Sequence, residues 1–195
     1  MSNVVKMYTF RMKHRTYNEA PGAIALFANT KLSWFWLIVR IYVGYEWVSA
    51  AWEKVTSVAW TGSAAGTALS GFVQGALSKT SGANPSVQSW YAVFLKSAIL
   101  THPVIWSYVV SYGELFVGLA LIIGAFTGIA AFFGLFMNLN YLLAGTVSIN
   151  PILFTLAIGL ILAWRVAGYI GADYWLLPWC GTPWQPGDLF EHGKK

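Results

Sequence analysis

A long apolar stretch that carries only two charges constrains this chain more than any other feature. Between Ser97 and Ala172 the only fully charged residues are Glu114 and Arg165. An ionised side chain inside hydrocarbon costs at least roughly 2.5–3.5 kcal/mol on insertion scales, so it is kept where it is paired, hydrated or functional. The stretch is long enough for three membrane crossings of about 20 residues each. The sequence therefore predicts an integral membrane protein with polar groups inside it.

The composition agrees with this prediction. Charged residues make up 10% and hydrophobic residues 57% of the 195 residues, whereas a soluble domain carries about 25% charged residues. Five Lys and Arg residues lie in the first 32 residues, which is typical of a cytoplasmic tail that faces anionic lipid. No basic face with base-stacking aromatics follows, so we expect the lipid bilayer, and not nucleic acid, as the partner.

The apolar segments predict an all-α fold, an integral membrane four-helix bundle. We expect a basic tail, a four-span membrane domain and a C-terminal tail over residues 1–32, 33–178 and 179–195. The spans are expected at about 33–52, 103–125, 127–147 and 151–171. The last three spans are joined by only a few residues, so they should be antiparallel neighbours.

Residues 53–102 are too polar to span a membrane. Within them, apolar residues recur at helical spacing on both sides of the turn Gly82-Ala83-Asn84-Pro85. This pattern predicts two short amphipathic helices at the membrane interface, and the alternative is an ordinary extramembrane loop. The segment holds three Lys residues against five basic residues in the N-terminal tail. The positive-inside rule then places both termini in the cytoplasm, with the protein in the cell membrane and its first span acting as an uncleaved anchor.

Six polar residues fall within or beside the predicted spans, and their depths follow from a rise of about 1.5 Å per residue. Arg40 and Arg165 then share one layer. A second layer, about 6–10 Å away, holds two glutamates and two asparagines: Glu46, Glu114, Asn138 and Asn140. The count predicts one polar pocket formed by all four helices.

Two interpretations of this pocket stay open. In the functional one, Arg40 or Arg165 binds Glu114 or an anionic substrate through bidentate contacts. Glu114 would then carry protons, and Asn138, with Asn140 and Glu46 nearby, would bind a quinone. In the structural one, an arginine–glutamate pair only orders the bundle, the asparagines join helices, and Arg165 extends to the cytoplasmic surface.

Metal and thiol chemistry are poorly supported. The chain has one cysteine and three histidines that are far apart in sequence. We therefore expect no haem, metal or iron–sulfur site within this chain. Cys180 lies in Trp-Cys-Gly-Thr-Pro, which resembles a thioredoxin motif without its second cysteine, and we interpret it as an inert interfacial thiol.

Several motifs together resemble the DoxX/DoxD-like membrane proteins. They include the segment that starts at Arg40 and ends at Lys54, Gly113-Glu114-Leu-Phe-Val-Gly118, and the segment that starts at Met137 and ends at Pro151. Ala163-Trp-Arg165-Val-Ala-Gly168 and the residues up to Asp173 complete the resemblance. It covers roughly residues 33–178 and is nearest to the DoxD subunit of thiosulfate:quinone oxidoreductase.

This resemblance implies a four-helix membrane fold and a link to quinone and sulfur-compound oxidation. The lead hypothesis is a membrane subunit of a quinone-linked oxidoreductase, in which thiosulfate is the donor and Glu114, Arg40 and Arg165 are catalytic. The second hypothesis is a non-catalytic accessory subunit of a larger membrane or respiratory complex, with other membrane subunits as partners. A small-molecule transporter is a weaker third hypothesis, because no inverted repeat is visible.

Overall fold

The computed structural model describes residues 20–184, and within this range it contains helices and no strands. The all-α class is confirmed. The elements are α1 (Pro21–Ala28), η1 (Thr30–Leu32), α2 (Ser33–Val55), α3 (Thr67–Leu77), η2 (Ser78–Thr80), α4 (Ser89–Phe94), the π-helical turn η3 (Leu95–Ile99), α5 (Pro103–Ile123), α6 (Thr127–Leu143), α7 (Asn150–Leu162) and α8 (Asp173–Trp179).

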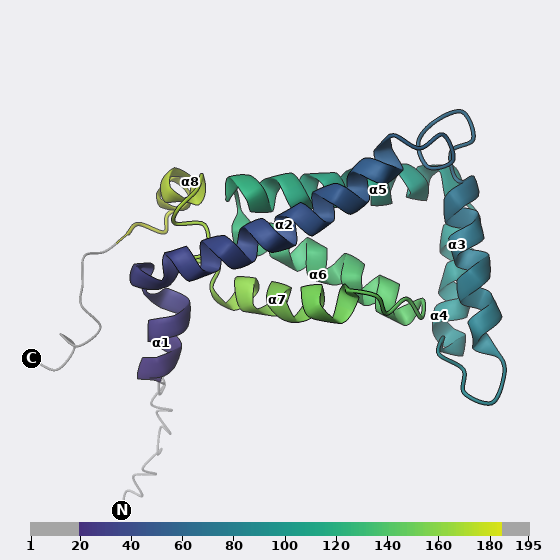
Figure 1. Ribbon diagram of the computed structural model, residues 1–195, viewed down its shortest axis with the longest axis horizontal. Coiled ribbons are helices and arrows are strands. Elements are labelled where there is room, and N and C mark those ends of the chain that lie inside the picture. The colour runs from purple at the N-terminus through teal and green to yellow at the C-terminus, as the bar shows by residue number, and fades with distance from the viewer. Residues whose placement is uncertain (1–19, 185–195) are drawn as a thin grey trace, which may run out of the picture.

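The four longest helices, α2, α5, α6 and α7, form the body of the molecule (Figure 1). Helix α2 packs against α5 and α7, and α6 packs against the same two helices. The elements α3, η2, α4 and η3, which we call the arm, run across one end of this body, whereas α1 and α8 lie at the opposite end (Figure 1). The arm therefore supplies the two short helices predicted within residues 53–102. Their position at a membrane interface stays a prediction.

Helices α2 and α5 approach each other closely through two glycines. A Cβ atom on Gly118 would lie 2.7 Å from the Val48 backbone nitrogen, and one on Gly44 would lie 2.9 Å from the Ile122 side chain. Small residues allow helix backbones to come together in this way, and such contacts are typical of membrane helices. The close approach brings the polar side chains of α2 and α5 within reach of each other.

Large apolar side chains cover the outside of the bundle. Ile38 on α2 is 70% exposed and Phe116 on α5 is 67% exposed. By length and composition, α5 can cross a membrane, and α1 and α2 qualify together although the chain bends by 52° between them. Helices α6 and α7 are apolar but shorter, with 17 and 13 residues. The described helices thus give one clear span, or two with the bent pair, where four were predicted.

The predicted fourth helix extends too far. Helix α7 ends at Leu162, and residues 163–172 form turns and bends. Gly168 and Gly171 disfavour a helix in this segment, and its end is fixed by bonds from the Ala172 and Asp173 N–H groups to the carbonyls of Ile123 and Gly124. The chain therefore folds back over the turn between α5 and α6. Of the predicted tails, 1–19 and 185–195 lie outside the described residues.

Candidate functional site

Glu114 lies at the centre of a buried ionic cluster that joins three helices. Its side chain projects inward from α5 and is 1% exposed. The Lys54 ammonium donates to Glu114 Oε2 at 2.6 Å, and the Tyr141 hydroxyl donates to Glu114 Oε1. Lys54 comes from the last turn of α2 and Tyr141 from α6. We call these three residues the Lys–Glu–Tyr cluster.

Lys54 connects this cluster to the end of the bundle near the arm. Its side chain is 18% exposed, and its ammonium lies 5.5 Å from the ring centroid of Trp60. It also donates a longer bond of 3.4 Å to the Ala50 carbonyl. A lysine ammonium with a partly exposed stem can remain hydrated while it neutralises a buried carboxylate. Glu114 itself is inaccessible, whereas Lys54 and Tyr141 are both partly exposed, Lys54 beside Trp60 near the arm.

The predicted pairing of Glu114 with an arginine is wrong. The Arg40 guanidinium is 1% exposed and donates to the Ile170 carbonyl at 2.8 Å, at the other end of α2. It also fits against Gly124, ten residues from Glu114 on α5, which is about 15 Å along a helix. Arg165 is exposed and lies over the Trp164 ring at 5.3 Å. The structure therefore holds two separate polar clusters, not one pocket.

Arg40 fits into the bundle because two glycines leave space for it. A Cβ atom on Gly124 would lie 1.5 Å from Arg40 Nη1, and one on Gly171 would lie 2.5 Å from it. Gly124 also has φ +75°, a left-handed conformation that ends α5 and favours glycine. Arg40 Nε and Nη1 have no hydrogen-bond partner among residues 20–184.

Asp173 belongs to the same end of the molecule. It is fully buried, and its two oxygens accept from the backbone N–H groups of Phe126 and Thr127, at 2.6 and 2.9 Å. A carboxylate in this position compensates unpaired N–H groups and the positive end of the α6 dipole. Asp173 and Arg40 also attract each other electrostatically. We call Arg40, Asp173, Gly124 and Gly171 the Arg40 cluster.

The remaining predicted residues lie apart from one another. Glu46 is half-buried on α2. Asn138 is fully buried, and neither atom of its amide has a hydrogen-bond partner within residues 20–184. Asn140 is half-buried, and its amide is bonded to the Phe136 carbonyl at 2.8 Å and to the Tyr91 hydroxyl at 3.1 Å. The two asparagines therefore face different surroundings, as expected for residues two positions apart on one helix.

An apolar groove of about 620 Å³ runs beside the Lys–Glu–Tyr cluster. Its walls are α5 and α6, and the arm closes one end of it. Tyr141 and Gly113 line it next to Glu114, together with Asn140 and Tyr91. Tyr91 links the arm to α6, because its hydroxyl donates to the Asn140 carbonyl at 3.0 Å, and burial raises the pKa of Tyr91 to about 12. We call this space the large groove.

The large groove and the Lys–Glu–Tyr cluster together permit proton transfer to an apolar molecule. The Tyr141 hydroxyl lies at the groove wall and is hydrogen-bonded to a carboxylate, which is in turn bonded to an ammonium. Such a chain can supply a proton at the groove and replace it from Lys54. Most wall residues are aliphatic or aromatic, and the volume matches that of small-molecule sites.

Sequence reasoning missed Lys54, Tyr141 and Asp173. Lys54 lies fourteen residues after Arg40, which is close to four helical turns and therefore the same face of α2. Tyr141 lies three residues after Asn138, again on a shared face. These spacings could have identified both residues. Asp173 gave no such signal, because its partners are backbone N–H groups that are remote in sequence.

Cys180 lies outside the two polar clusters. Cys180 is exposed, directly after α8, and forms no disulfide. Within residues 20–184 no group of three or more His, Cys, Asp or Glu side chains could hold a metal ion.

The model of the DoxX family matches residues 35–147 of the chain. No curated protein and no solved structure matches the chain. The matched segment is more than half of the 195 residues, and it contains nearly all of α2 together with the arm, α5 and α6. It therefore includes the Lys–Glu–Tyr cluster and the large groove. This chain is a membrane protein that belongs to the DoxX family.

Proposed function

We propose that this protein is the quinone-binding membrane subunit of an oxidoreductase. The observation that carries the proposal is that Tyr141 both lines the large groove and donates a hydrogen bond to the buried Glu114 carboxylate. A quinone ring would enter the groove between α5 and α6 and accept a hydrogen bond from Tyr141. Its isoprenoid tail would remain among the apolar side chains of the groove.

The reaction that fits this site is reduction of the quinone by two electrons and two protons. Glu114 and Tyr141 would deliver the protons, and Lys54 would restore them. The resemblance to the DoxD subunit suggests thiosulfate as donor. Two thiosulfate anions would lose one electron each and join through a new sulfur–sulfur bond as tetrathionate. The role of Arg40 or Arg165 in binding the thiosulfate electron donor stays a prediction. Both residues lie away from the large groove.

The proposed setting is the cell membrane. The four helices α2, α5, α6 and α7 would cross it, and the arm would lie at its outer surface. Helices α1 and α8 lie at one end of the bundle (Figure 1), which supports a topology with both helices on one side of the membrane. The positive-inside rule assigns that side to the cytoplasm. Partner subunits would carry the donor half of the reaction.

A non-catalytic accessory subunit is the second candidate. It is favoured by the fact that both Glu114 oxygens are engaged, one by α2 and one by α6. A cluster of this kind can order three helices without taking part in a reaction.

Glu114→Gln distinguishes the two candidates. The protein should be purified with its native lipids and any co-purifying subunits, and thiosulfate-dependent reduction of a short-chain quinone should be measured beside its extracted quinone content. We expect at least about a hundredfold loss of turnover, since general acid–base groups contribute about 10²–10⁴-fold. The matched control is Glu53→Gln, because Glu53 is exposed and next to Lys54.

The outcome that contradicts quinone chemistry is also specific. If Glu114→Gln and Tyr141→Phe lower the melting temperature but leave quinone content and turnover unchanged, the Lys–Glu–Tyr cluster is structural. The accessory role is then the better description.

A further inference from the structure

A second groove lies at the end of the bundle opposite the arm. It has a volume of about 400 Å³ and is formed by α6, the end of α7 and the α8 region. Apolar side chains such as Phe132, Ile161 and Leu177 make up most of its lining, and Trp164 and Cys180 complete the wall. We call it the α8 groove. It lies at the end of α6 remote from the Lys–Glu–Tyr cluster.

A positive charge lies at the edge of the α8 groove. The Arg165 guanidinium is 5.3 Å from the ring centroid of Trp164, and Trp164 lines the groove. Arg165 is exposed. Among the described residues, 20–184, no carboxylate forms an ion pair with it. The guanidinium is therefore available to an anion that approaches the groove from outside.

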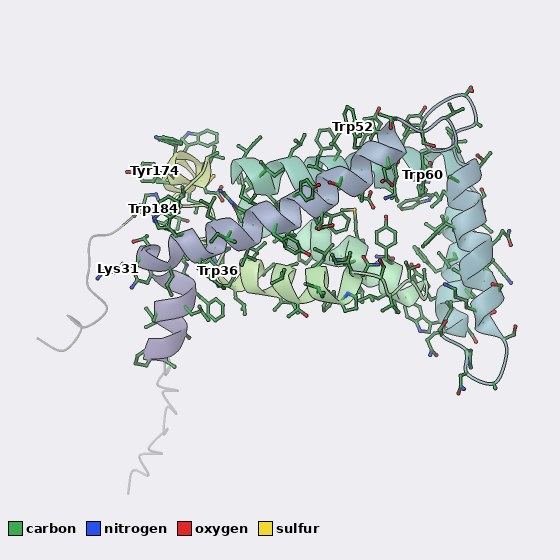
Figure 2. The ribbon with its side chains drawn as sticks, in the orientation of Figure 1. Lys31, Trp36, Trp52, Trp60, Tyr174 and Trp184 are labelled. Carbon is green, nitrogen blue, oxygen red and sulfur yellow. The ribbon has the colours of Figure 1, made fainter. Side chains whose placement is uncertain are left out.

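Aromatic side chains surround the same end of the molecule. Trp175 and Trp179 on α8 are 71% and 83% exposed. Tyr174, on α8, and Trp184 stack on each other at 6.4 Å, far from Trp52 and Trp60 at the arm end (Figure 2). Tryptophan and tyrosine prefer the level of the lipid headgroups. The end of the molecule that contains the apolar α8 groove thus also carries exposed aromatic residues and one cation at the groove wall.

We propose that the α8 groove binds one anionic phospholipid. An acyl chain would lie between α6, α7 and α8, and Arg165 would bind the phosphate through two parallel N–H bonds. The planar guanidinium of Arg165 matches the geometry of a phosphate group. A headgroup with a net negative charge is preferred, because no carboxylate among residues 20–184 pairs with Arg165. This site is separate from the proposed quinone site and does not depend on it.

Cys180 provides a direct reporter for the test. It is exposed, it lines the α8 groove, and it is the only cysteine of the chain. The full-length protein in detergent should be treated with N-ethylmaleimide in the presence of phosphatidylglycerol, phosphatidylcholine or inorganic phosphate. Intact-mass analysis then measures alkylation, and native mass spectrometry measures bound lipid. We expect phosphatidylglycerol to slow alkylation of Cys180 and to give a one-lipid adduct.

Two substitutions sharpen the test. Arg165→Gln should weaken phosphatidylglycerol binding about fivefold, which is the effect of one basic side chain near anionic lipid. Lys96→Gln is the matched control, because Lys96 is exposed in the arm at the other end, and it should leave binding unchanged. Equal binding of phosphatidylcholine, or unchanged binding by Arg165→Gln, would overturn the proposal. Protection by inorganic phosphate alone would also overturn it, since it would show an anion site without a lipid chain.

Discussion

Glu114 and Arg40 are both buried charged residues of one bundle, but they are stabilised in different ways. Glu114 has a cationic partner and a hydroxyl partner on two other helices. Arg40 has one backbone carbonyl as acceptor, Asp173 nearby, and two guanidinium nitrogens without a partner among residues 20–184. Direct hydrogen bonds and an ion pair therefore stabilise Glu114. Arg40 is accommodated instead by the space beside two glycines and by the backbone conformation around it.

This difference explains which part of the bundle suits chemistry. The Lys–Glu–Tyr cluster borders the large groove and is connected to the exterior by Lys54. The Arg40 cluster is enclosed by the turn between α5 and α6 and by the segment before α8. Loss of a charged partner should therefore destabilise the protein most at the Lys–Glu–Tyr cluster. At the Arg40 cluster, a side chain added at a glycine should be the most destabilising change.

The largest effect is expected for Lys54→Met. The substitution leaves Glu114 buried without its cation, which costs about 3–5 kcal/mol of unfolding free energy. Thermal or denaturant unfolding followed by tryptophan fluorescence measures the loss. The double variant Lys54→Met with Glu114→Leu should recover most of it, because no buried charge remains. A double variant as unstable as the single one would show that pairing is not what stabilises the Lys–Glu–Tyr cluster.

Gly124→Ala should have the next largest effect. Its Cβ atom would collide with the Arg40 guanidinium, and φ +75° disfavours alanine. Together these effects should cost about 2–3 kcal/mol, measured by the same unfolding experiment. Gly113→Ala is the matched control in α5, because its Cβ atom would meet only Met137 Sδ at 3.6 Å. Similar losses in both variants would contradict the account of the Arg40 cluster.

The smallest effects concern the two asparagines, and only the substitution of Asn140 should lower stability. Asn138→Leu removes a buried amide that has no protein partner within residues 20–184, so stability should stay the same or rise by up to about 1 kcal/mol. Asn140→Leu removes an amide bonded to Phe136 and Tyr91, so stability should fall by about 1 kcal/mol. A clear loss of stability in Asn138→Leu would show that its amide has a partner that the helices do not supply.

Hydropathy and turn residues predict the long helices of the bundle, but not the short helices α1 and α8. The predicted spans at 33–52, 103–125 and 127–147 correspond to α2, α5 and α6, since continuous apolar segments with glycine or proline at their ends leave few alternatives. The arm also follows from its helical spacing. The early end of α7 was missed, because residues 163–172 remain apolar and the bonds that bend them come from residues remote in sequence.

The candidate site was only partly predictable. A charge in an apolar stretch needs compensation, and this identifies Glu114 as a site residue. Its partner does not follow from depths along straight spans, because Lys54 lies just beyond the predicted end of the first span. Helix α2 continues to Val55, and Lys54 reaches back into the bundle. A count along a helix axis cannot show the direction of a long side chain.

The outward position of Lys54 has a consequence for energy conversion. If the quinone is reduced at Tyr141 and Lys54 restores the protons, both protons enter from the compartment that the arm faces, because Lys54 is partly exposed beside Trp60 at that end. Turnover would then make that one compartment more alkaline and leave the other unchanged. Quinone reduction in this bundle would take up protons from one side of the membrane only.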